Sequence, residues 1–162
     1  MRRKLRVAAY AVCVREGQLL LARSPAPGGG HEWVLPGGGM EFGEDPYDTV
    51  RRELLEETGY RVAVTGFLGV DSRRVTLPGR FGRRPVDHHG VRLVYSAEIT
   101  GGELRNEVGG STDQAAWQHL DSLPGLVRIP LVDTALRLWS ERPPTGHLAP
   151  ADASLPREMN EE

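Results

Sequence analysis

The order of apolar and polar residues predicts a chain that begins with strands. Two short apolar runs, Val7 to Val14 and Gln18 to Ala22, flank a turn containing Gly17, a pattern typical of a β-hairpin. A Pro- and Gly-rich loop follows, and a short strand from Trp33 is ended by Pro36. A glycine-rich loop over residues 37–43 then leads into a helical pattern.

The helix predicted most firmly covers residues 46–58. Asp45 is a good N-cap, and Pro46 falls at the first helical position, where its missing N–H costs nothing. Gly59 is expected to end the helix as its C′ residue. Helical spacing predicts a buried stripe formed by Tyr47, Val50 and Leu54.

The second half of the chain predicts further strands and one more helix. An arginine-rich connector, Asp71 to His89, is expected to carry a short strand around Val75 to Leu77. The remaining elements are strands at 61–70, 91–99 and 115–117 and a helix within 126–140, whose apolar side holds Leu131, Ala135 and Leu138. Mixed strands with two helices predict an α/β sandwich, in which a sheet carries a helix on each face.

Composition and charge exclude several classes of protein. The chain has 162 residues and a net charge of −2, so we expect one domain with no general attraction to nucleic acid or to a membrane surface. No apolar stretch approaches the ~18 residues of a membrane span. The lone Cys13 cannot form an internal disulfide, and a cytoplasmic location is expected. The domain should cover 1–141, followed by a Pro-rich, solvated tail over 142–162.

Candidate chemistry lies on the predicted helix. Glu53, Glu56 and Glu57 follow an i, i+3, i+4 spacing, which places three carboxylates on one side, away from the apolar stripe. Their repulsion would be relieved by a hard divalent cation, and Mg²⁺ suits a carboxylate site that also holds phosphates. The alternative is that these glutamates form an ordinary solvated helix face.

The surroundings favour the metal. Gly38 is followed after five residues by Glu44, and after seven more by the run Arg52-Glu53-Leu54-Leu55-Glu56-Glu57-Thr58-Gly59-Tyr60. This pattern resembles the Nudix box, with every fixed identity at its expected spacing. Tyr60 departs from the pattern, since an aliphatic residue is usual there.

The resemblance implies a Nudix-type α/β/α sandwich with a mixed sheet between helices. It also implies a Mg²⁺-dependent pyrophosphohydrolase, with Mn²⁺ as a substitute, that cuts the diphosphate bond of a nucleoside triphosphate, ADP-ribose or nucleotide sugar. Metal would lie on Glu53, Glu56, Glu57 and the carbonyl of Gly37, with Arg52 orienting the carboxylates and Gly38 and Glu44 supporting the loop or a second metal. The general base would be Glu53 or a later acid, Glu107 or Asp113.

Five arginines crowd the 71–89 connector, and Arg83 and Arg84 are candidate phosphate ligands there, unless the segment is an ordinary solvated loop. Two other functions stay open: a non-catalytic Nudix-fold domain that senses a nucleotide, and a prenyl-diphosphate isomerase using Cys13. The expected partner is a small nucleotide, with neither nucleic acid nor membrane, and a homodimer is left open.

Overall fold

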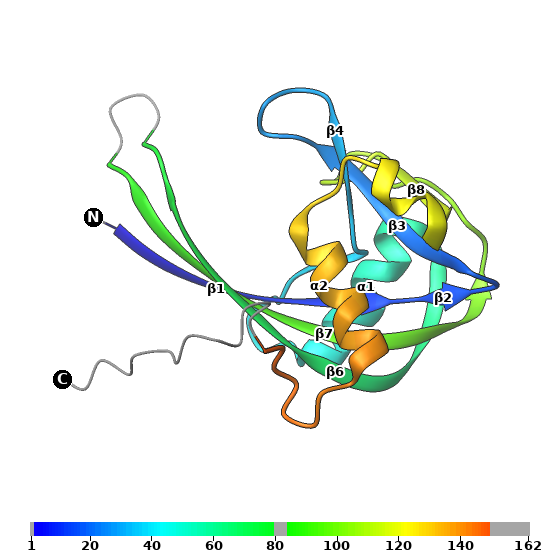
Figure 1. Cartoon of the computed structure of the whole chain (residues 1–162). Helices are drawn as coiled ribbons and strands as arrows, with labels where there is room; N and C mark the ends of the chain where they lie inside the picture. Colours follow the sequence, from blue (N-terminus) through cyan, green and yellow to red (C-terminus); the bar gives the residue numbers. More distant parts are fainter. Residues whose placement is uncertain (1, 80–83, 150–162) are drawn as a thin grey trace.

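The computed structural model describes residues 2–79 and 84–149 and contains two sheets placed between two helices (Figure 1). The first sheet has the order β5-β1-β7-β6. Its strands are β1 (Arg2–Val12), β5 (Gly37–Gly39), β6 (Tyr60–Leu77) and β7 (Val86–Gly102). Because β1 pairs parallel with β7 while β6 pairs antiparallel with β7, this sheet is mixed, as predicted.

The second sheet is built on β3 (Gln18–Pro25), which pairs on both edges. Its other strands are β2 (Val14–Arg15), β4 (His31–Val34) and β8 (Gln114–His119). The short 3-10 helix η1 (Leu120–Gly125) connects β8 to the last helix.

Two apolar clusters hold the helices against the sheets. Helix α1 (Pro46–Thr58) inserts Val50 and Leu54 against Ala9 and Ala11 of β1. Helix α2 (Pro130–Glu141) covers the other side, and its buried residues are Leu131, Val132, Ala135 and Leu138. The helix ends follow the sequence signals: Asp45 accepts a hydrogen bond from the Tyr47 N–H at 2.8 Å, and Gly59 has φ +79°. The predicted helix on each face is therefore confirmed.

Three local predictions are wrong. The expected hairpin pairs only Val14–Arg15 with β3, because residues 2–12 join the other sheet. Tyr47 is 43% exposed and lies beside Arg51 rather than in the buried stripe. The connector is much shorter than expected, because β6 continues to Leu77 and β7 begins at Val86.

The extended strands form an arm. Residues 2–7 of β1, 71–77 of β6 and 86–92 of β7 pair with one another and run together away from the helices (Figure 1). Neither helix covers the arm, so the two faces of its strands carry charged and apolar side chains without the alternation of a half-buried strand. This explains why the sequence pattern predicted only parts of these strands and not their full length.

The predicted tail begins with a docked segment. The Val70 N–H donates to the Gly146 carbonyl at 2.9 Å, and a Cβ on Gly69 would lie 2.3 Å from the same oxygen. Leu148 packs against the α2 side of the core. Gly146 and Leu148 of the predicted tail therefore dock on the domain, and residues 150–162 lie outside the described residues. In the described part of the chain, no helix is long and apolar enough to span a membrane.

Candidate metal and phosphate site

The glycine-rich segment brings backbone directly against the carboxylates of α1. β5 pairs with β1, with Gly38 opposite Ala9 and Gly37 opposite Tyr10. Gly37 has φ +144°, and a Cβ there would lie 2.3 Å from the Ala9 carbonyl oxygen. A Cβ on Gly38 would lie 2.7 Å from Oε1 of Glu53. Glycine is needed at both positions because side chains would occupy the space taken by β1 and by Glu53.

Glu57 is the most buried of the three glutamates. It is 2% exposed, and its Oε2 accepts a hydrogen bond from the Gly37 N–H at 2.9 Å. Burial raises the pKa of Glu57 to about 8, and the nearby charges of Glu53 and other glutamates act in the same direction, while the Gly37 N–H opposes them. The prediction that all three carboxylates lie away from the apolar stripe is wrong for Glu57. Three residues after Leu54, Glu57 falls on the buried stripe.

Arg52 donates hydrogen bonds to Glu44, Glu53 and Glu56. Its Nε donates to Glu44 at 2.8 Å, and its Nη2 donates to the second oxygen of Glu44 at 3.0 Å. Its Nη1 donates to Glu53 at 3.0 Å and to Glu56 at 3.3 Å. The Arg52 guanidinium holds the pKa of Glu44 down at about 2. These contacts favour loop support, rather than metal ligation, as the role of Glu44.

Glu53 and Glu56 differ in exposure. The Glu53 side chain is 15% exposed, and burial raises its pKa, although Arg52 acts in the opposite direction. The Glu56 side chain is 48% exposed and lies toward the outer end of the cluster. The three glutamates therefore form a series that runs from the interior to the solvent.

Glu53 and Glu57 face a cavity of about 240 Å³, here called the carboxylate cavity. It is also lined by Gly37, Gly38 and Gly39 and by residues that sequence reasoning missed, among them Arg6, Tyr10, Ser24, Ser111 and Thr112. Strand alternation in β1 places Arg6 and Tyr10 on one face. The alternation can be read from the sequence, but the sequence does not show that this face of β1 borders a cavity beside α1.

Of the two later acids, only Glu107 lies near the cluster. Its charge helps to raise the pKa of both Glu53 and Glu57, and it accepts hydrogen bonds from the Thr112 N–H and hydroxyl at 3.2 and 2.7 Å. Asp113 instead pairs with Arg23 at 3.0 Å and His31 at 3.3 Å, and Arg23 lowers its pKa. Asp113 is therefore occupied elsewhere.

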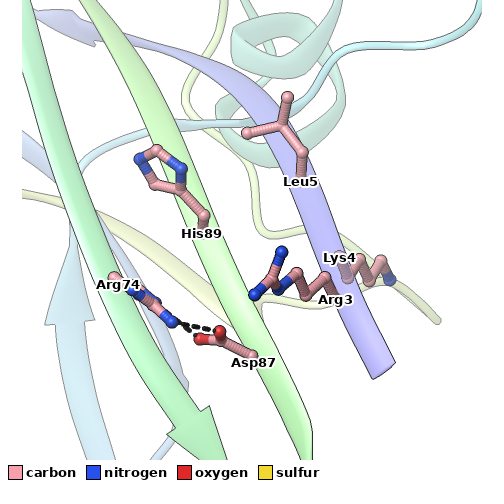
Figure 2. Close-up of a pocket in the computed structure, with 6 residues that line it drawn as sticks. All are labelled: Arg3, Lys4, Leu5, Arg74, Asp87 and His89. Atoms are coloured by element: carbon pink, nitrogen blue, oxygen red, sulfur yellow. Dashed lines mark hydrogen bonds and ion pairs between the residues drawn. The ribbon is translucent and has the colours of Figure 1, made fainter. Parts of the chain in front are cut away.

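One of the two predicted phosphate ligands, Arg84, does not line the carboxylate cavity. Arg84 is exposed at the far end of the arm, and Arg83 lies outside the described residues. A larger cavity of about 430 Å³ also lies on the arm, lined by the six residues of Figure 2. Its dashed contacts join Arg74 to Asp87, and no glutamate of α1 reaches it. It is not the site of the predicted chemistry.

The donor set fits a hard cation. Within residues 2–79 and 84–149, no three His, Cys, Asp or Glu side chains already converge as a metal site. Glu57 is held by the Gly37 N–H, and Glu53 and Glu56 by Arg52. A cation would have to draw these carboxylates together, and it would offset the burial and repulsion that raise the pKa of Glu53 and Glu57.

Cys13 offers no reactive thiol. It is buried in the α1-side core, and burial raises the pKa of its thiol to about 12. A thiol that keeps its proton and lies outside the carboxylate cavity does not supply the chemistry of a Cys/Glu-based isomerase.

Comparison with known proteins identifies the family of this chain. The NUDIX domain profile matches residues 2–141. The chain is 36% identical over 121 residues to an NAD-capped RNA hydrolase of Chromobacterium violaceum, covering 73% of this chain and 40% of that protein. It is 36% identical over 94 residues to an ADP-ribose pyrophosphatase of Methanocaldococcus jannaschii, covering 58% and 50%. The chain thus spans about half, or less, of the length of these curated relatives.

Solved structures extend the match over most of the chain. A MutT NUDIX hydrolase from Burkholderia pseudomallei superposes with a TM-score of 0.63 at 30% identity, covering 83% of this chain and 98% of that one. A NUDIX hydrolase from Nitrosomonas europaea has a TM-score of 0.68 at 22% identity, covering 85% and 90%. The predicted Nudix-type sandwich is confirmed, and the chain belongs to the NUDIX family.

Proposed function

We propose that this protein is a divalent-cation-dependent pyrophosphohydrolase that cuts the diphosphate bond of a nucleoside diphosphate derivative. One observation carries the proposal: Glu57 is buried beside other glutamates, pairs with no arginine among residues 2–79 and 84–149, and lies next to glycine backbone that lines a cavity. A buried carboxylate cluster with too little positive charge is suited to a cation and to the anion that the cation binds.

In this proposal Glu53, Glu56 and Glu57 hold the cation, together with the carbonyl of Gly37. Bound Mg²⁺ would act as a Lewis acid on the phosphate and lower the pKa of a coordinated water. Arg52 is a positioning residue, because it holds Glu53 through Nη1 while Glu44 fixes its other nitrogens. The glycine segment lets the diphosphate approach backbone without obstruction by side chains.

Two groups are candidates for taking the proton from the attacking water. Glu53 borders the carboxylate cavity, and burial raises its pKa toward the range useful for a base. Glu107 is held by Thr112, which also lines that cavity. The test replaces each residue by Gln in turn and measures kcat as a function of pH. The general base sets the fall of kcat at low pH, so this part of the profile should change only when the true base is replaced.

For the substrate we propose a nucleotide joined through its diphosphate to a second organic group, and nucleoside triphosphates stay in the test because another relative is named as a putative 8-oxo-dGTP diphosphatase. Relatives are named as an ADP-ribose pyrophosphatase and an NAD-capped RNA hydrolase. These names favour a nucleotide joined through its diphosphate to a second organic group, ahead of a simple nucleoside triphosphate.

The test measures phosphate or mononucleotide release from ADP-ribose, NAD⁺, nucleotide sugars and nucleoside triphosphates with Mg²⁺, with Mn²⁺ and with excess EDTA. We expect turnover that disappears in EDTA and falls at least about a hundredfold in Glu57→Gln. Glu98→Gln makes the same chemical change at an exposed position of β7 and should match wild type. Nucleotide binding without any turnover would instead identify a sensing domain.

A further inference from the structure

A second cavity adjoins the carboxylate cavity where the arm meets the body of the domain. It has a volume of about 320 Å³. We call it the arginine cavity, and its lining residues are Arg6, Ala8, Tyr10, Arg73, Val75, Leu77, His88, Gly90 and Arg92. Arg6 and Tyr10 line both cavities, so the two compartments share a wall.

The two cavities differ in their charged groups, although Arg6 lines both. The carboxylate cavity holds Glu53 and Glu57, whereas the arginine cavity is lined by three arginines and a histidine. Arg92 is paired with Asp71. Among residues 2–79 and 84–149, neither Arg6 nor Arg73 has a carboxylate within ion-pair distance. Two guanidinium groups are therefore available to an anion, and the arginine cavity needs no metal to bind one.

Tyr10 marks the boundary between the compartments. Burial raises the pKa of its hydroxyl, and the charges of Glu53 and Glu57 act in the same direction, while Arg6 and Arg92 oppose them. The Arg6 guanidinium lies against Gly39, with Nη2 3.0 Å from the position of a Cβ there. A molecule that passes Tyr10 therefore leaves the carboxylates and immediately meets arginines.

The arginine cavity also has an apolar side. Val75 is 36% exposed and Leu77 is 45% exposed, both on β6. Strand alternation places them on the same face as Arg73, while Arg74 faces the other side of the arm (Figure 2). Exposed apolar side chains next to unpaired guanidinium groups can contact the flat face of a ring while the arginines bind a phosphate.

We propose that the arginine cavity binds a further phosphate group on the part of the substrate that lies beyond the scissile diphosphate. This inference rests on the proposed function and deepens it, because it names a substrate whose second half is itself a phosphorylated nucleoside. The phosphate can be a monoester on a dinucleotide or the first phosphodiester of a nucleotide chain, since both present the same anionic oxygens to Arg6 and Arg73.

Equilibrium binding tests the cavity without catalysis. Titration calorimetry in EDTA compares AMP with adenosine, in wild type, Arg73→Ala and Arg3→Ala. Arg3 is the matched control, since it removes the same charge from the same arm but lines the cavity on the other face (Figure 2). We expect AMP to bind at least about tenfold more tightly than adenosine in wild type and Arg3→Ala, because the phosphate gains a charge-assisted hydrogen bond from arginine. Arg73→Ala should remove this preference.

Hydrolysis then distinguishes the source of the phosphate. The three substrates are NAD⁺, NADP⁺ and NAD⁺ joined through its 3′ oxygen to a short RNA, each assayed with saturating Mg²⁺. A higher kcat/KM for NADP⁺ identifies a monoester, and a higher value for the RNA-joined form identifies a phosphodiester. In either case the preference should fall in Arg73→Ala and persist in Arg3→Ala.

Two results would overturn the inference and leave the proposed function standing. The first is cleavage of NAD⁺ with equal kcat/KM for all three substrates. The second is a preference that Arg73→Ala and Arg3→Ala change to the same extent. A different result would refute the proposed function instead, namely AMP binding that depends on Arg73 together with no hydrolysis of any diphosphate.

Discussion

Glu57 should make the metal-free protein less stable as the pH rises. Its carboxyl has a pKa of about 8 in the folded state, against 4.5 for an ordinary glutamate. Between these values the folded protein keeps a proton that the unfolded chain has lost, so the free energy of unfolding falls with increasing pH. The slope approaches 1.4 kcal/mol per pH unit, and the full interval corresponds to roughly 5 kcal/mol, a large part of the stability of a small domain.

The perturbation is Glu57→Gln, which removes the titrating proton and keeps an oxygen that can accept from the Gly37 N–H. Urea unfolding in EDTA at pH 5, 6, 7 and 8 should show a steep loss of stability for wild type and a shallower one for the variant. Glu44, whose pKa is lowered to about 2, contributes with the opposite sign, but only below about pH 4.5, outside this range.

The second part of this experiment adds Mg²⁺. Since a cation binds the ionised carboxylates of the folded state, its stabilising effect should grow from pH 6 to pH 8 in wild type and be much smaller in Glu57→Gln. Equal pH slopes for the two proteins in EDTA would refute the burial argument. Equal Mg²⁺ stabilisation at pH 8 would refute the assignment of the cation to Glu57.

Three further outcomes are expected. Arg52→Lys should lower kcat by about tenfold or more, measured by steady-state kinetics, because lysine cannot reproduce the forked contacts of a guanidinium; a near-wild-type rate would contradict this. Gly38→Ala would place a Cβ 2.7 Å from a carboxylate oxygen of α1 and should lower kcat by about tenfold, with unchanged circular dichroism. Gly28→Ala, where nothing lies within 4 Å, is its control. Truncation after Glu141 removes the docked segment and should lower Tm by about 5 °C, whereas a chain ending at Ala149 should melt like wild type.

Local signals in the sequence predicted α1 to the residue. Asp45, Pro46 and Gly59 act through contacts within one turn of the helix, so their meaning does not depend on the rest of the fold. The spacing of the glutamates also depends only on nearby residues. It correctly predicted that Glu53, Glu56 and Glu57 lie on one helix with Arg52.

The arm could not be predicted in the same way. β6 continues through Arg73 and Arg74 because its backbone pairs with β7, and no apolar alternation records that pairing. The burial of Glu57 was missed for a related reason. A glutamate within an amphipathic helix is normally assigned to the solvated side. Only the structure shows that β5 brings the Gly37 N–H close enough to donate to the buried Glu57 carboxylate.

Two glutamates of one motif, Glu44 and Glu57, thus differ in protonation behaviour, because the Arg52 guanidinium lowers the pKa of Glu44 whereas burial raises the pKa of Glu57. Glu44 engages two nitrogens of Arg52 and thereby keeps the guanidinium at the outer side of α1. Glu44 therefore fixes the guanidinium that donates to Glu53, although Glu44 itself does not line the carboxylate cavity. On the other side of the carboxylate cavity, Arg6 lines the wall that this cavity shares with the arginine cavity. An anionic substrate that extends beyond Glu53 and Glu57 therefore contacts Arg6.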